Sequence, residues 1–102
     1  MDEQELIRLA QSGDDRALTE LYRRYAPIAF KSAYLLTGDR SLAEDVVQDT
    51  FIQVVRKIDT LRDPTRFRPW LFQILTNVAK TAHRKRFWQR WLPLDLDSHD
   101  KP

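Results

Sequence analysis

Four polar residues between positions 73 and 84 have the types and the spacing of a nucleic-acid contact. Successive residues of an α-helix lie about 100° apart around its axis. On a helix, one narrow stripe therefore consists of Gln73, Asn77, Lys80 and Arg84, and it contains no carboxylate. Amide groups can read base edges, and cationic groups can neutralise phosphates. The pattern predicts a surface that binds nucleic acid.

The other side of the same predicted helix is apolar and would face the protein core. It consists of Trp70, Leu71, Ile74, Leu75, Val78, Ala79 and Ala82. We expect the helix to begin at Pro69, because an amide hydrogen at the first helical position would have no partner. Phe67 and Trp70 are expected to be structural. Asn77 has a low helix propensity and lies off the apolar side, which favours a functional role.

The rest of the sequence predicts an all-α protein, a compact bundle of about four helices. The chain has only two glycines and no convincing strand pattern of alternating polar and apolar residues. A first helix is expected over Glu3–Gln11. A second is expected to run from an Asp14 or Asp15 cap to Thr37, with Pro27 kinking or splitting it. The apolar positions of this second helix are Leu18, Leu21, Tyr22, Tyr25, Ile28, Ala29 and Leu36.

A third helix is expected to open at Ser41, because Ser41 and Glu44 have the spacing of a capping box. Its inward side should consist of Val46, Val47, Phe51, Val54, Val55 and Ile58. The opposite side carries Asp45, Gln48, Asp49, Ile52 and Arg56. An apolar centre with a polar rim is typical of a protein interface. A solvated face with one stray apolar residue has the same pattern, so both interpretations stay open.

Charge is divided unevenly along the chain. Residues 1–50 contain ten acidic residues and six Lys or Arg, whereas residues 51–94 contain two acidic and ten basic residues. A basic half favours a polyanionic partner. Cysteine is absent, and the two histidines, His83 and His99, make no metal-binding set. Because catalytic spacings and a glycine-rich phosphate loop are also lacking, the sequence predicts no enzyme activity, no metal and no cofactor.

The apolar runs are short, and the acidic start of the chain lacks the features of a signal peptide. We therefore expect a cytoplasmic protein with no membrane segment. Residues 1–92 are expected to form one domain, since a chain of this size can bury one modest core. Residues 93–102 begin with Pro93, and leucine alternates with aspartate at positions 94–97, so we expect the start of a disordered interdomain linker.

Two motifs together resemble region 2 of extracytoplasmic-function (ECF) sigma factors, which belong to the sigma-70 family. The first is AEDVVQDTF at residues 43–51, and the second is WLFQILTN at residues 70–77. The resemblance runs from Gly13 to Arg90, and the joint spacing of the motifs is more specific than either motif alone. It implies a fold of the sigma region 2 type. A complete factor also has a second helical domain, so the chain is expected to be a fragment or an isolated domain.

The resemblance also implies a partner for each predicted surface. Asp45, Gln48 and Asp49 correspond to the helix that binds the β′ clamp helices of core RNA polymerase, and we add Ile52 as the apolar centre. In that family, a loop and the helix after it capture the non-template strand of the promoter minus-ten element. The loop corresponds to residues 59–68, which include Arg66. On the helix, the corresponding residues are Asn77, Lys80, His83 and Arg84, with Gln73 in the same stripe. The two surfaces are expected on separate flanks. An anti-sigma factor that masks them is a further candidate partner.

Two alternatives have different partners. One is a regulator that binds duplex DNA, although the chain lacks a convincing helix-turn-helix. The other is an interaction module whose basic helix binds an acidic protein. The roles of Phe87, Trp88 and Trp91 stay open, because these rings could stack on bases, cover another domain or pack on the bundle.

Overall fold

The structure, a computed structural model, describes residues 2–91, with the backbone alone at positions 90 and 91. Its elements are α1 (Glu3–Gln11), α2 (Asp15–Thr37), α3 (Arg40–Lys57), the 3₁₀ turns η1 (Ile58–Thr60) and η2 (Pro64–Arg66), and α4 (Phe67–Trp91). The predicted all-α bundle of four helices is confirmed. The expected linker and the Trp91 side chain lie outside the described residues. Within residues 2–91, no helix has the length and apolar character needed to cross a membrane.

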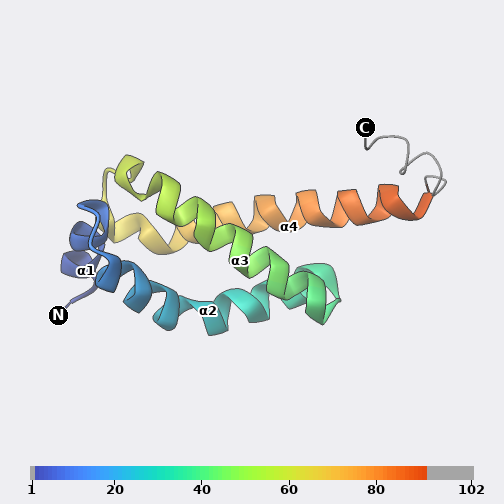
Figure 1. Cartoon of the computed structure of the whole chain (residues 1–102), viewed down its shortest axis with the longest axis horizontal. Helices are drawn as coiled ribbons and strands as arrows, with labels where there is room; N and C mark the ends of the chain where they lie inside the picture. The colour runs from blue at the N-terminus through green and yellow to red at the C-terminus, as the bar shows by residue number, and fades with distance from the viewer. Residues whose placement is uncertain (1, 92–102) are drawn as a thin grey trace.

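Helices α2, α3 and α4 pack lengthwise, and α1 lies at one end, near the connection from α3 to α4 (Figure 1). The core contains large side chains such as Leu21, Leu71 and Leu75, and completely buried alanines, Ala29, Ala33 and Ala43. Burial of each large apolar side chain contributes about 1.5–3 kcal/mol. Alanine at the other positions allows the helix backbones to approach closely. At the opposite end from α1, α4 extends beyond the other helices (Figure 1).

Helix α3 begins at Arg40, so the prediction of a capping box opened by Ser41 was wrong. Gly38 ends α2 in the left-handed conformation, with φ of 68°, and Asp39 follows directly as the cap of α3. The Leu42 amide donates to Asp39 Oδ1 over 2.8 Å. This hydrogen bond lowers the pKa of Asp39. The carboxylate is the better cap here because its negative charge also lies beside the positive end of the helix.

Two other predicted boundaries differ from the structure. Pro27 bends α2 but does not split it, because α2 is one helix from Asp15 to Thr37 and changes direction near its middle (Figure 1). Helix α4 begins at Phe67 rather than Pro69. The Phe67 side chain is completely buried, and its ring lies 5.3 Å from the Tyr25 ring. Packing of Phe67 thus draws the start of α4 into the core, and its structural role is confirmed.

Four apolar residues that were predicted to face inward are exposed: Tyr22, Ile28, Leu36 and Val55. Val54 and Ile58 are four residues apart and share the buried side of the α3 end. Val55 is one residue further around the helix and is directed to solvent. The predicted apolar side of α4 is confirmed, since its residues are buried or packed against the core.

Tyr25 attaches α1 to the rest of the bundle. Its single hydroxyl hydrogen is shared between the two carboxylate oxygens of Glu3, which lie 2.8 and 2.9 Å from the Tyr25 oxygen. Burial of the phenol and the hydrogen bond to Glu3 raise the pKa of Tyr25 to about 12. Because the folded state favours the protonated phenol, this stabilisation is complete below about pH 10 and is lost as the pH rises towards the folded pKa.

Tyr25→Phe should lower the free energy of unfolding at neutral pH by about 1 kcal/mol, because it removes one charge-assisted hydrogen bond at a partly open site. The difference from the wild-type protein should shrink as the pH rises from about 10 to about 12. Urea unfolding at several pH values measures both. Tyr34→Phe is the control, since Tyr34 is half exposed. A difference that stays constant over this pH range would contradict the prediction.

Candidate functional site

The exposed face of α3 carries the four residues predicted to bind a protein partner. We call this set the α3 ridge: Asp45, Gln48, Asp49 and Ile52, all exposed. The ridge faces solvent because the other side of α3 is in the core, including Val46 and Val47. Thr50 is also buried, and its hydroxyl donates to the Val46 carbonyl over 2.7 Å. The core therefore uses the inner face of α3 and leaves the ridge residues available.

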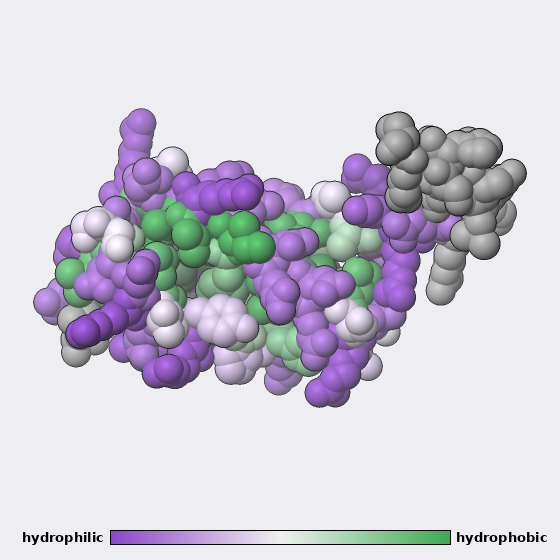
Figure 2. All heavy atoms as spheres, viewed as in Figure 1, coloured by the Kyte–Doolittle hydropathy of each residue, from purple (hydrophilic) through white to green (hydrophobic). Residues whose placement is uncertain are grey.

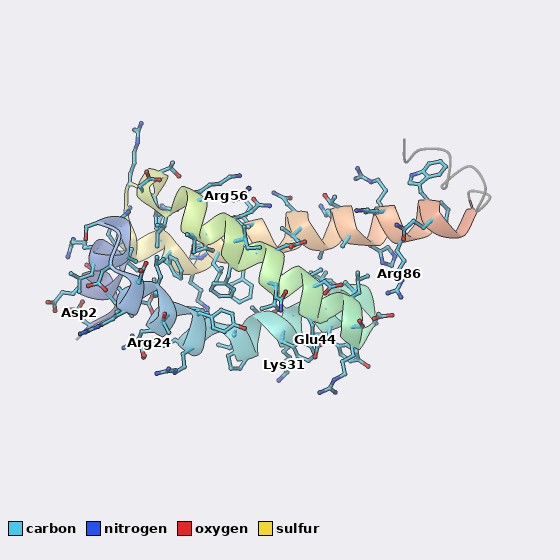
Figure 3. The ribbon with its side chains drawn as sticks, viewed as in Figure 1. Asp2, Arg24, Lys31, Glu44, Arg56 and Arg86 are labelled. Atoms are coloured by element: carbon cyan, nitrogen blue, oxygen red, sulfur yellow. The ribbon has the colours of Figure 1, made fainter. Side chains whose placement is uncertain are left out.

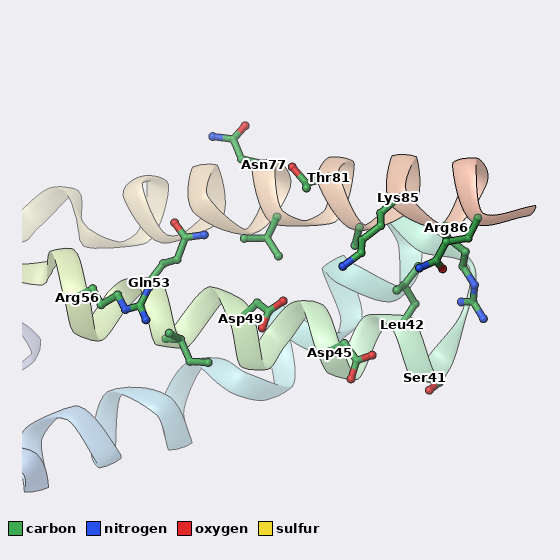
Figure 4. Close-up of a pocket in the computed structure, with 14 residues that line it drawn as sticks. Ser41, Leu42, Asp45, Asp49, Gln53, Arg56, Asn77, Thr81, Lys85 and Arg86 are labelled. Atoms are coloured by element: carbon green, nitrogen blue, oxygen red, sulfur yellow. The ribbon is translucent and has the colours of Figure 1, made fainter. Parts of the chain in front are cut away.

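A groove of about 650 Å³ lies between the α3 ridge and α4 (Figure 4). Its lining includes Asp45, Asp49 and Ile52 from α3, and Asn77, Lys85 and Arg86 from α4. One wall is therefore acidic and the other mainly basic. Figure 4 shows Lys85 extending towards α3 and Asn77 extending away from it. The expectation of two separate flanks was wrong, because the antiparallel packing of α3 and α4 brings Asn77 to the rim of the groove that the acids line.

The predicted cations of α4 lie on its other flank. Lys80, His83 and Arg84 are exposed, and they line a second groove of about 370 Å³ with Leu36, Thr76, Ala79 and Phe87. Apolar side chains from α2 and α4 thus lie beside a cationic rim. The stripe predicted from the sequence is divided between two grooves, with Asn77 on one and Lys80 and Arg84 on the other. Gln73 is exposed one turn before Asn77.

Arg66 is exposed at the end of the loop that connects α3 to α4, which we define as residues 58–66. Within this loop, Asp63 Oδ1 accepts hydrogen bonds from the Thr65 amide, over 3.0 Å, and from the Thr65 hydroxyl, over 2.7 Å. These bonds to Thr65 lower the pKa of Asp63. The Asp63 carboxylate therefore caps η2 and fixes the turn from which Arg66 extends.

An apolar groove between α2 and α3 was missed by the sequence reasoning. It has a volume of about 470 Å³ and is lined by Tyr22, Gln48, Phe51, Ile52, Val55 and Arg56. Ile52 is 50% exposed and Val55 is 55% exposed. Figure 2 shows this apolar area over the middle of α3, surrounded by hydrophilic side chains. The available signal was the spacing of Ile52 and Val55, which places both on one side of a helix.

One ion pair attaches α4 to the turn between α2 and α3. Arg86 Nη1 lies 2.8 Å from Asp39 Oδ2, and Figure 3 shows Arg86 on the side of α4 that faces this turn. The same carboxylate caps α3, so it links the start of α3 to the extended part of α4. Beyond this pair, the rings of Phe87 and Trp88 lie edge to face, 5.9 Å apart, and both are half exposed.

Residues 21–89 match the Sigma-70 region 2 family. The chain belongs to this family. Its similar proteins include the ECF RNA polymerase sigma factor SigE of Mycolicibacterium smegmatis, 37% identical over 91 residues, which cover 84% of this chain and 35% of that protein. The ECF RNA polymerase sigma-E factor of Haemophilus influenzae is 38% identical over 91 residues, or 84% of this chain and 47% of that protein. The chain thus spans less than half the length of these relatives.

A solved structure of an engineered region 2 of sigmaE in complex with GTAAAA superimposes on this chain with a TM-score of 0.82. The two are 29% identical, and the match covers 90% of this chain and 96% of that one. The fold is therefore that of sigma region 2, as predicted. The family match begins within α2, so α1 of this sigma region 2 domain lies outside the matched residues.

Adjacent valines of α3 test whether the apolar groove is a surface or part of the core. Val55→Ala should change the free energy of unfolding by less than about 0.5 kcal/mol, because Val55 is exposed. Val54→Ala should lower it by about 2 kcal/mol, because Val54 is buried and its methyl groups would leave a cavity. Chemical denaturation measures both values. Equal losses for the two variants would show that Val55 belongs to the core.

Proposed function

We propose that this sigma region 2 domain acts in transcription initiation by binding core RNA polymerase and capturing unpaired bases of the promoter minus-ten element. The observation that carries the proposal is the contrast between neighbouring helices, with an exposed acidic ridge on α3 and exposed amide and cationic groups on α4. None of these side chains is buried in the core. The similar region 2 structure in complex with GTAAAA supports the DNA part of the proposal.

The DNA strand is proposed to follow the flank of α4 that carries Lys80, His83 and Arg84. Phosphates are attracted to this flank, whose groove has no carboxylate in its lining, whereas Asp45 and Asp49 offset the cations that line the groove between α3 and α4. Asn77 lies between the two flanks and can donate and accept hydrogen bonds at a base edge, with Gln73 one turn away. The loop 58–66 and Arg66 then hold a base that has left the duplex.

The chemistry is differential binding, in which no covalent bond is made or broken. Separating a base from its stack costs a few kcal/mol. A surface that binds the separated strand better than the duplex shifts the opening equilibrium by the difference between the two binding free energies. Cationic groups supply affinity for any sequence, and Asn77 with the loop supplies the preference for particular bases.

Polymerase is proposed to dock on the α3 ridge, with its β′ clamp helices as the contacting element. The carboxylates of Asp45 and Asp49 can pair with basic side chains, and Gln48 can add hydrogen bonds. Ile52 and the adjoining apolar groove provide area that loses water on contact. The cytoplasmic location expected from the sequence follows from this partner. An anti-sigma factor that covers the same ridge would compete with polymerase.

Asp49→Arg should strongly weaken binding to core polymerase while leaving the free domain folded, because Asp49 is exposed and the change opposes a basic partner. We expect a loss of at least about tenfold in affinity, measured by pull-down with purified core enzyme. Glu5→Arg in α1 is a matched charge reversal and should bind normally. Normal binding by Asp49→Arg would reject the docking assignment.

Asn77→Ala should reduce the preference for the favoured minus-ten sequence over a substituted one, by about 1–3 kcal/mol, with little change in thermal stability.

Lys80→Ala should instead weaken binding to all sequences and lower the slope of log affinity against log salt concentration by about 0.7. Titration of single-stranded oligonucleotides into the polymerase-bound protein measures both. An unfolded Asn77→Ala protein would make that residue structural, and a general preference for duplex DNA would favour the duplex-binding alternative.

A further inference from the structure

The side chain of Gln11, the last residue of α1, reaches the loop between α3 and α4. Gln11 Nε2 donates to the Ile58 carbonyl over 3.0 Å and to the Leu61 carbonyl over 2.6 Å. These partners lie 47 and 50 residues further along the chain. They are located at the two ends of η1. One amide therefore bridges the turn with which the loop begins.

The other hydrogen bonds of the loop are local. The Leu61 amide donates to the Ile58 carbonyl over 3.1 Å, and the Arg66 amide donates to the Asp63 carbonyl over 2.9 Å. Such bonds set the shape of each turn without fixing the turns relative to the helices. Within residues 2–91, Gln11 supplies the only hydrogen bonds that join the loop to a distant part of the sequence.

Gln11 suits this task because its terminal amide has two N–H donors and is partly buried. A carbonyl oxygen can accept two hydrogen bonds, so the Ile58 carbonyl accepts from Gln11 as well as from the Leu61 amide. Ile58 and Leu61 are themselves buried, so their side chains anchor the base of the loop in the core. Arg62, Thr65 and Arg66 remain exposed on it. The loop thus has a fixed base and a polar outer part.

We propose that Gln11 is a positioning residue for base capture. Its hydrogen bonds hold the loop 58–66 in the position and orientation that contact with a base outside the duplex requires. The inference rests on the proposed function of that loop. A loop already ordered before binding loses less conformational entropy when the base enters, so its preference for the correct base is larger. Helix α1 thereby contributes to the selection of promoter sequence.

Gln11→Met tests this, because methionine keeps the length and volume of the side chain without the N–H donors. The first readout is amide hydrogen exchange. Exchange of the Leu61 amide should accelerate about threefold to tenfold, while the amides of the α3 centre keep their wild-type rates. Gln4→Met, an exposed site on the same helix, is the matched control and should change neither.

The second readout is the ratio of affinities for a GTAAAA strand and for strands with one abasic position, scanned along the sequence. Gln11→Met should lower the largest ratio about threefold to tenfold and leave the affinity for the corresponding abasic strand unchanged. Gln11→Lys restores an N–H donor and should recover part of the ratio.

Three outcomes overturn the inference in distinguishable ways. Unchanged Leu61 exchange in Gln11→Met would show that Gln11 does not hold the loop. Faster exchange with an unchanged affinity ratio would show that the restraint has no role in base capture. A wild-type protein that favours no base over an abasic site would reject the loop as a capture site, and with it both the DNA part of the proposed function and the role of Gln11.

Discussion

Burial of the apolar sides of α2, α3 and α4 against one another determines the positions of all the proposed contact residues on α3 and α4. Each helix places one side in the common core, and the completely buried alanines Ala29, Ala33 and Ala43 bring the backbones close together. Rotation of α3 or α4 about its own axis would expose apolar residues and bury charged ones, at a cost of several kcal/mol. The exposed face of each helix therefore points in a fixed direction. The α3 ridge and the cations of α4 keep fixed positions relative to each other.

Polar contacts then fix the ends of the helices. Asp2, Asp14 and Asp39 cap α1, α2 and α3, with Glu5, Ala17 and Leu42 among the amides they accept from. Part of the acidity of the first half of the chain is therefore a means of starting helices rather than a partner surface. The basic residues Lys80, Arg84 and Lys85 of α4 have no such capping role and are exposed.

The same polar contacts connect elements whose proposed roles differ. Asp39 caps α3 and pairs with Arg86 of α4, and Tyr25 joins α1 to the packing around Phe67 at the start of α4. Acidic and basic walls also share the groove between α3 and α4. The proposed polymerase surface and the proposed DNA surface are therefore adjacent parts of one helix pair, and a partner on one changes the electrostatic field at the other.

The sequence by itself determined the helical class, the exposure of the α3 ridge and of the α4 cations, and the family motifs, because helical periodicity is a local property. The cap at Asp39 is also local, and the glycine before it was the available signal. Only the tertiary structure decided that Asn77 shares a groove with Asp45 and Asp49, that Val55 is exposed, and that Gln11 reaches the loop. These features depend on how far each helix is rotated and where it crosses its neighbours. Packing between residues far apart in the chain sets those quantities, and periodicity along one segment carries no information about them.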